Sequence, residues 1–394
     1  MSRRQLFGSL CSLVFLVNFG RVVFSPLLEP LKATFGVTDA AVGLLATLVW
    51  FGSAIPRIPV GYLLTRVDRH TVVLLSGCVL SGSALFAATA GTIEVLMVAA
   101  LCLGISSGAY FTAANPLITE LFPDRVGDMI GVHGMASQFA AVVAPPVIAL
   151  MLFVGSWRVT FLLLAGVGVV TTIVLVLATL RTELPRAGGD DRDFFGAAIH
   201  QWRLILVAVV IVGVTSFVWN GLFNFYVTYL VTTKAISQSA AQGLLTVLFG
   251  AGIPAFVITG YLAERLPNGP LMLGICGLFA GCLVVLTHTT GYVPLFVISF
   301  VMGYVIHGLF PTVDTFMLSA LPDEHRASAY AVYSGGMMIA QAPGSSVIGS
   351  LLSSGVPFDT VLLGLAGVIL VVMCGATGLY ATGRFPGMGS PIGQ

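Results

Sequence analysis

Charged side chains are rare in this chain, and one of them stands where a charge is costly. Arg21 lies deep inside the apolar run 6–31. If that run crosses a membrane, an unpaired charge there costs at least about 2.5–3.5 kcal/mol, so Arg21 needs a partner. Its guanidinium group suits a carboxylate, phosphate or sulfonate, which it can bind through two parallel hydrogen bonds. The alternative is a structural arginine that pairs with Asp314 or with backbone carbonyl groups.

A second arginine in an apolar run is Arg57, which stands between Pro56 and Pro59 in the run 40–65. Its side chain is long enough to reach the polar interface, and that is the simpler interpretation. Two arginines inside the first half, with only one buried acid elsewhere, nevertheless favour an anionic substrate.

An acid and a histidine share the run 292–320. His307 and Asp314 lie seven residues apart there, so a helix would place them on one face. Such a pair inside a membrane helix is typical of a proton relay. The alternative is that Asp314, near the end of the run, is an ordinary interfacial residue. Tyr110 and Asn115 stand in the matching run of the first half.

Amides and tyrosines supply the remaining candidates. Asn220 and Asn224 are one turn apart, so they share a helical face and could contact one ligand together. A hydrogen bond that only joins helices is an equal alternative, and the isolated amides of Gln138 and Gln341 more often pack than bind. His133 and His288 are expected at the surface. The predicted substrate-binding residues are Arg21, Tyr110, Asn115, Gln138, Asn220, Asn224, Tyr226, His307 and Gln341, with Asp314 and His307 as carriers of the proton.

The composition defines the solvent in which these residues work. Apolar residues make up 57% of the chain, charged residues 8%, and the mean hydropathy is +1.02. Soluble domains contain about 25% charged residues, so most of this surface must face lipid. A net charge of +1 argues against nucleic acid as a partner. The six cysteines form no Cys-x-x-Cys pair, no phosphate-binding glycine loop with lysine occurs, and no catalytic set appears, so we expect neither cofactor nor metal nor enzymatic activity.

Twelve apolar segments are long enough to cross a membrane, which takes roughly 20 residues. They are 6–31, 40–65, 70–90, 93–119, 129–153, 157–180, 201–230, 239–263, 270–288, 292–320, 328–352 and 358–381. Basic residues orient them, because they concentrate on the cytoplasmic side. With both termini inside, the cytoplasmic set is Arg3, Arg4, Arg66, Arg69, Arg125, Arg181, Arg186, Arg192, Arg203, Arg265, Arg326 and Arg384, against Lys32, Arg158 and Lys234 outside.

The chain repeats itself. GYLLTRVDRH at 61–70 returns as GYLAERLPNG at 260–269, and LFPDRVGD at 121–128 is echoed by LPDEHRAS at 321–328. Two parallel copies of one hydrophobic unit are typical of carriers. We therefore expect a six-helix half at 1–182, a cytoplasmic linker at 183–203 and a second six-helix half at 204–394.

The repeated loop resembles a signature of the major facilitator superfamily, Gly-x-x-x-Asp-Arg-x-Gly-Arg-Arg. The first copy keeps Gly61, Arg66 and Arg69, and the second keeps Gly260, Glu264 and Arg265. The resemblance implies close packing at the glycine and a charge cluster that locks or releases helix ends. Thr65 replaces the acid of the signature, and Glu120 is the candidate to substitute for it.

Two further elements resemble branches of that family. Val17-Asn18-Phe19-Gly20-Arg21 resembles the Asn-Tyr-x-Asp-Arg element of anion–cation symporters, with Gly20 in place of the acid. Ala140 and Ala144-Pro145 resemble a faded Gly-x-x-x-Gly-Pro antiporter signature, although simple bending by proline explains them as well.

These observations predict an all-α integral membrane protein of twelve helices in two pseudo-symmetric halves. The expected activity is alternating-access transport of a small carboxylate-type anion across the cytoplasmic membrane, coupled to protons, by a monomer. The alternative activity is proton-coupled efflux of hydrophobic compounds. A receptor or scaffold would need a soluble domain, which these segments do not provide.

Overall fold

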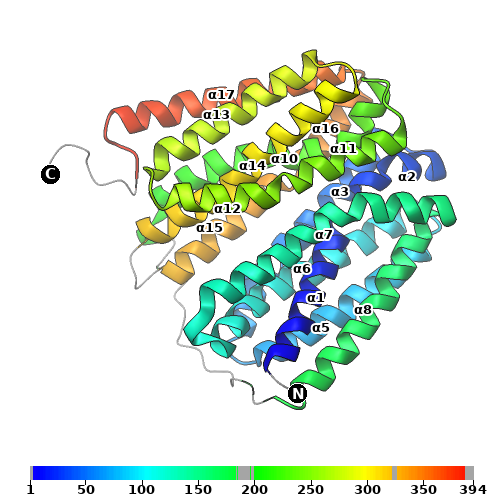
Figure 1. The fold of residues 1–394 in the computed structure, drawn as a ribbon, viewed down its shortest axis with the longest axis vertical. Coiled ribbons are helices and arrows are strands. Elements are labelled where there is room, and N and C mark those ends of the chain that lie inside the picture. The colour runs from blue at the N-terminus through cyan, green and yellow to red at the C-terminus, as the bar shows by residue number, and fades with distance from the viewer. Residues whose placement is uncertain (1–2, 183, 185–195, 197–198, 322–325, 387–394) are drawn as a thin grey trace. The chain divides into compact units, whose positions relative to one another are not determined.

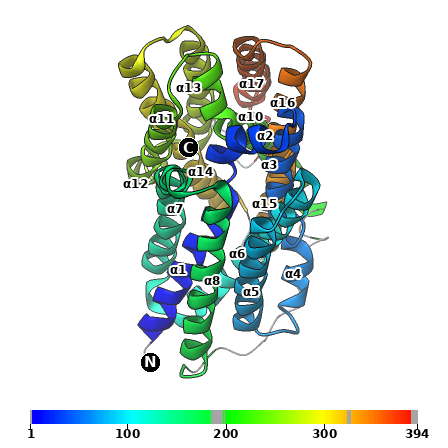
Figure 2. The ribbon, with the colours of Figure 1, turned by 90° about the vertical axis from the view of Figure 1, so that its right-hand side faces the viewer.

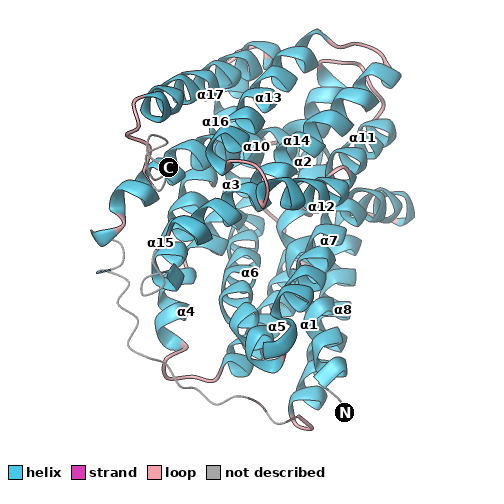
Figure 3. Ribbon diagram, turned by 60° about the vertical axis from the view of Figure 1, so that its left-hand side comes forward, coloured by secondary structure: helices cyan, strands magenta, loops and turns pink. Residues whose placement is uncertain are grey.

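The computed structural model describes residues 3–182, 184, 196, 199–321 and 326–386, and the side chains of 326–328 are not described. Every regular element in these ranges is a helix, as the absence of strands in Figure 3 makes plain. The chain divides into two compact units, Met1–Arg192 and Asp193–Gln394. Most of the expected linker, 183–203, lies outside the described residues, although Trp202 and Arg203 already belong to a helix.

The first unit contains six membrane-length segments, labelled in Figures 1 and 2. Its helices are α1 (Arg3–Val22), η1 (Ser25–Leu27), α2 (Leu28–Phe35), α3 (Asp39–Ala54), α4 (Arg57–Leu63), α5 (Arg69–Ala88), α6 (Ile93–Leu121), η2 (Pro123–Arg125), α7 (Val126–Val154) and α8 (Trp157–Thr179). The helices of the second unit are α10 (Trp202–Thr232), α11 (Gln238–Gly250), α12 (Gly252–Ala263), α13 (Asn268–His288), α14 (Tyr292–Ala320), α15 (Arg326–Gln341), α16 (Gly344–Ser353) and α17 (Phe358–Ala381).

Eleven of the predicted spans are single apolar stretches of sufficient length within the described residues. The twelfth, predicted as one helix over 328–352, is divided into α15 and α16 at Ala342–Pro343. Pro343 lies at this break, and it has no backbone N–H to donate to the preceding turn. With this division, the prediction of an all-helical twelve-span fold is confirmed.

Local sequence signals fix several helix ends. The side chains of Thr92 and Ser237 accept hydrogen bonds from the backbone N–H groups of Val95 and Ala240 at the starts of α6 and α11. Such caps satisfy N–H groups that have no partner within the helix. Gly36 ends α2 with φ of +64°, a left-handed conformation that glycine adopts without strain.

The two units repeat one packing pattern. In the first unit α1 packs on α7, α3 on α6, and α5 on both α6 and α8. In the second unit α10 packs on α15, α11 and α12 on α14, and α13 on both α14 and α17. These pairs correspond helix for helix, so the internal repeat of the sequence is a repeat of helix contacts.

Glycines permit the closest of these contacts. A Cβ added at Gly104 on α6 would lie 2.9 Å from Gly52 Cα on α3, and one added at Gly221 on α10 would lie 2.8 Å from Gly344 O on α16. Backbones can approach this closely only where side chains are missing. Gly260 differs, because an added Cβ there would meet only Pro311 Cβ, at 4.0 Å, so close packing does not explain the glycine of the second loop motif.

Candidate functional site

Arg21 lies in the last turn of α1, partly buried against aromatic rings. Its guanidinium carbon is 4.1 Å from the centre of the Trp50 ring on α3 and 5.6 Å from that of Phe111 on α6. The Nε atom is buried and makes no hydrogen bond within the described part of the chain, and no acid there forms an ion pair with the guanidinium group. The rings stabilise the cation from the side without neutralising its charge.

Positive charge accumulates at this point of the first unit. Arg57, the first residue of α4, is close enough for its charge to act on Arg21. Two acids of the same unit, Glu29 and Asp39, pair with Lys32. Two cations that repel each other make this region attractive to an anion.

The aromatic partners of Arg21 are positioned by the crossing of α3 and α6. Gly52 and Gly104 let the two backbones approach closely, and Trp50 and Phe111 belong to these same two helices. Gly20, where the symporter element has an acid, faces leucines: an added Cβ would lie 3.5–3.6 Å from Leu80, Leu103 and Leu164. A carboxylate at position 20 would therefore enter apolar packing.

Tyr110 is fully buried, and its hydroxyl group is engaged by protein groups. It donates a hydrogen bond to Leu10 O at 2.7 Å, so the contact of 2.9 Å with His133 makes the Nε2–H of His133 the donor. His133 is only 2% exposed, which corrects its expected surface position. These contacts join α1, α6 and α7 and leave Tyr110 a packing role. Of the other candidates in this unit, Asn115 is exposed on α6 and Gln138 half-buried on α7.

Asn220 and Asn224 meet in a buried polar cluster on α10, each 1% exposed. Asn224 Nδ2 donates to Asn220 O at 2.9 Å and to Ser345 Oγ, on α16, at 3.0 Å. Ser345 Oγ in turn donates to Asn220 Oδ1 at 3.0 Å. The Nδ2 atom of Asn220 is buried without a hydrogen-bond partner in the described residues. The cluster therefore contains one unused donor.

Tyr226, on α10, and Gln341, on α15, are both buried. Tyr226 is buried, and its hydroxyl group lies 2.6 Å from Ser299 Oγ. Ser299 donates to Leu295 O, so Tyr226 must be the donor to Ser299. This chain of bonds ties α10 to α14. Gln341 is the last residue of α15, 6% exposed, and lies four residues before Ser345 across the break between α15 and α16.

His307 is enclosed by aromatic rings on α14 and neighbouring helices. The ring centres of Trp219, Phe249, Phe256 and Phe310 lie 5.3–6.3 Å from its own. Its Nδ1 is 2.7 Å from Gly303 O, a pure acceptor, so Nδ1 carries a proton, and Nε2 is an acceptor whenever the ring is neutral. The surroundings suit a flat or apolar group that brings a donor.

Asp314 lies on α14 and accepts a hydrogen bond of 2.6 Å from the hydroxyl group of Tyr330 on α15. His307 bonds instead to the backbone of its own helix, and no hydrogen bond joins these two residues in the described part of the chain. The expected relay is therefore not a direct contact in this conformation.

The loop motifs contain one ion pair and two stacked arginines. Arg69 is buried at the start of α5 and binds Glu120 Oε1, at the end of α6, at 2.9 Å. Glu120, the candidate to substitute for the acid missing at Thr65, thus pairs with an arginine of the loop motif. Arg66 stacks on Tyr62 at 5.3 Å and Arg265 on Tyr261 at 3.9 Å. Gly61 is buried in α4, and Glu264 is exposed just beyond α12.

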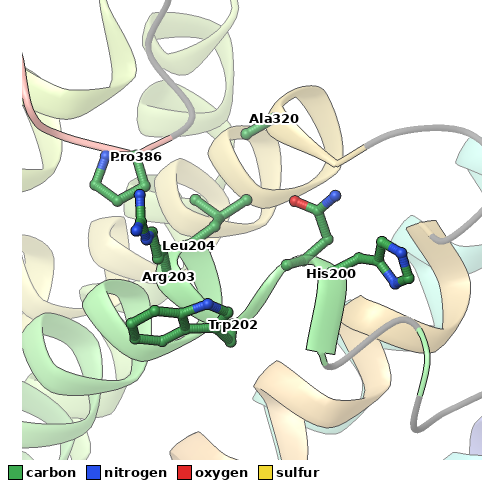
Figure 4. A pocket seen from close by; sticks show the side chains of 7 residues that line it. His200, Trp202, Arg203, Leu204, Ala320 and Pro386 are labelled. Carbon is green, nitrogen blue, oxygen red and sulfur yellow. The ribbon is translucent and has the colours of Figure 1, made fainter.

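Three of the cavities in the described part of the chain lie away from these residues. One of about 440 Å³, at the start of α10, is surrounded by His200, Gln201, Trp202, Arg203, Leu204, Ala320 and Pro386 (Figure 4). An apolar groove of about 710 Å³ runs between α5 and α8, and one of about 410 Å³ lies against α1, α7 and α8. None of the three is lined by a predicted substrate-binding residue.

Sequence reasoning missed several contacts of the candidate residues. Trp50 and Phe111 contact Arg21, Ser345 contacts both Asn220 and Asn224, and Tyr330 contacts Asp314. None of these four residues carries a signal of that role in a single sequence. Serines and aromatic residues are common in membrane helices, and only the fold tells which of them meet.

The fold, with its apolar helices of membrane length, is that of a polytopic membrane protein. The family model described as Major Facilitator Superfamily matches residues 10–345, and the chain belongs to this superfamily of membrane transporters. The fold is similar to that of a bacterial homologue of the human lysosomal transporter Spinster in an inward-facing, occupied conformation (TM-score 0.78, 18% identity, 96% of this chain and 97% of that one). It is equally similar to a mutant of the nucleoside transporter NupG (TM-score 0.78, 15% identity, 96% and 99%).

The curated relatives match a smaller share of this chain than the solved structures do. The purine ribonucleoside efflux pumps NepI of Shigella sonnei and Salmonella typhimurium are each 24% identical over 263 residues. The match spans 64% of this chain and 64% of the length of those relatives.

Proposed function

We propose that this transporter carries a small organic anion, of the carboxylate type, across the cytoplasmic membrane by alternating access. The observation that carries the proposal is the environment of Arg21: a stacked guanidinium group with a second cation acting on it and no acid bound to it among the described residues. A substrate carboxylate supplies the missing countercharge.

The other elements of the proposal extend it. Asn220 and Asn224 contribute hydrogen bonds to the substrate, and Asp314 carries the coupled proton, because it is an acid inside a membrane helix. The distribution of arginines supports cytoplasmic termini, and a monomer is the expected working unit.

The test compares the thermal stability of the purified full chain and of Arg21→Ala in detergent. The probes are benzoate, succinate, inorganic phosphate and tetraphenylphosphonium. A ligand at about 100 times its Kd adds about 2.7 kcal/mol, so a bound anion raises the unfolding temperature of the wild type and leaves Arg21→Ala unchanged. Arg203→Ala, which removes an exposed arginine stacked on Trp202, is the matched control and keeps the response.

A second candidate function is proton-coupled export of uncharged hydrophobic or heterocyclic compounds. The rings around His307 favour it, and relatives described as nucleoside carriers point the same way. In that case tetraphenylphosphonium or a nucleoside stabilises the wild type and Arg21→Ala equally. Asp314→Asn then abolishes export, whereas Arg21→Ala leaves it intact.

A further inference from the structure

Only one of the two polar atoms of the Asn220 side-chain amide has a hydrogen-bond partner among the described residues. Its Oδ1 atom accepts from Ser345 Oγ at 3.0 Å, whereas its Nδ2 atom is buried and has no partner in the described part of the chain. A buried donor without an acceptor is unfavourable, so it calls for an explanation. The amide could relieve this cost by rotating, and the neighbouring residues decide whether it can.

Donor and acceptor chemistry fixes the orientation of this amide. Asn224 Nδ2 can only donate, so Ser345 Oγ accepts at their 3.0 Å contact. The single proton of Ser345 then goes to an oxygen of Asn220, with Oδ1 at 3.0 Å closer than the backbone O at 3.3 Å. Rotation of the Asn220 amide would also place Nδ2 3.5 Å from Asn224 Nδ2, opposing two donors. The cluster therefore holds Oδ1 inward and leaves Nδ2 unused.

The position of Ser345 is itself dictated by backbone packing. Ser345 is fully buried and follows Gly344, the first residue of α16. Gly344 lies directly on α10, because an added Cβ would be 3.0 Å from Gly221 N and 3.1 Å from Phe217 C. The hydroxyl group thus meets Asn220 and Asn224 through a contact that only glycine permits.

We propose that Ser345 is a positioning residue that sets the Asn220 amide as a hydrogen-bond donor for an acceptor atom of the substrate, such as a carboxylate oxygen. This inference rests on the proposed function, and it deepens that function by assigning the polarity of the second polar contact. Nδ2 is covered in this conformation, so an acceptor reaches it when neighbouring side chains move aside during the transport cycle. The unmet donor is then satisfied by substrate.

The chain suits a direct test, because asparagine occurs only at positions 18, 115, 220, 224 and 268. Full-length protein labelled with ¹⁵N-asparagine gives few side-chain NH₂ signals in an NMR spectrum, and Asn220→Asp identifies those of Asn220. We expect Ser345→Ala to shift the signals of Asn220 and Asn224, and Ser345→Thr, which restores a hydroxyl group, to return them towards wild type. Ser353→Ala, at the far end of α16, is the control and leaves them unchanged.

Benzoate is the ligand probe. It should shift the Asn220 NH₂ signals of the wild type, and Ser345→Ala should weaken its Kd about tenfold, the loss of roughly one oriented hydrogen bond. Unchanged Asn220 signals in Ser345→Ala overturn the inference without any ligand. Benzoate that stabilises the protein but leaves the Asn220 signals in place overturns the donor role. If neither benzoate nor the other anions bind, the anion proposal fails, while the positioning by Ser345 is still decided by the ligand-free spectra.

Discussion

A single methyl group placed at Gly344 should separate α16 from α10. The added Cβ of Gly344→Ala would overlap Phe217 O and lie 3.0 Å from Gly221 N. Both are backbone atoms, which cannot rotate away as a side chain does, so α16 must shift. Overpacking of this kind costs about 1–3 kcal/mol.

The same shift breaks the polar cluster. Two buried hydrogen bonds of Ser345, with Asn220 Oδ1 and Asn224 Nδ2, depend on that contact. At about 0.5–1.5 kcal/mol each, their loss adds about 1–3 kcal/mol. We therefore expect Gly344→Ala to lower the free energy of unfolding by about 2–6 kcal/mol, which is large beside the usual effect of one substitution.

The assay is the unfolding temperature of the purified protein in detergent, followed by the fluorescence of a thiol-reactive dye that reports exposure of buried cysteines such as Cys276. Gly364→Ala on α17 is the matched control, since an added Cβ there meets nothing within 4 Å and alanine is the better helix former. The reasoning is refuted if the two variants unfold at the same temperature. It is also refuted if Gly344→Ala unfolds early while the NH₂ signals of Asn220 stay unchanged.

Two further predictions concern the first unit. Trp50→Leu should remove the ring on which Arg21 stacks and weaken the benzoate response more than the loss of stability alone explains, because cation–π contacts contribute about 0.5–2 kcal/mol. The control Trp202→Leu removes an exposed ring stacked on Arg203 and should leave the benzoate response unchanged. Equal losses of response in both variants would contradict the role given to Trp50. Glu120→Gln should destabilise the protein by about 1 kcal/mol, because it breaks the ion pair with buried Arg69. Asp128→Asn breaks an exposed ion pair with Arg125 and should have no measurable effect on stability. A double-mutant cycle of Glu120→Gln and Arg69→Gln that gives no coupling energy would rule out a stabilising pair.

Hydropathy predicts the twelve spans well because their length is set by the membrane and their composition by lipid. Breaks within spans are the main departure, since the chain divides at Ile55–Pro56, at Ala251 and at Ala342–Pro343. A proline in an apolar run allows such a break without locating it. The absent acid at Thr65 made Glu120 a candidate to replace it, but that its partner is Arg69 follows only from the structure.

Side-chain partners within the bundle were harder to predict. In a membrane helix both faces are apolar, so periodicity does not reveal which face is buried. His133 was expected at the surface and is buried against Tyr110, and Tyr110 and Tyr226 are engaged in bonds between helices. Ser345 was invisible because a serine in an apolar run has many ordinary roles, and only the glycine contact between α10 and α16 places it beside Asn220.

The stacked tyrosine–arginine pairs bear on the depth at which each unit sits in the bilayer. Tyr62 and Tyr261 are 58% and 52% exposed, and each holds an arginine four residues later against its ring. Such amphipathic groups prefer the headgroup region, so in each unit the tyrosine–arginine pair anchors one helix end at that depth. In a bilayer thinner or thicker than the apolar length of the helices, these anchors oppose movement of the unit along the membrane normal. The mismatch between helix length and bilayer thickness must then be accommodated by helix tilt or by deformation of the lipid. Transport rates measured across lipids of increasing chain length should therefore show an optimum that broadens when both tyrosines are replaced by leucine.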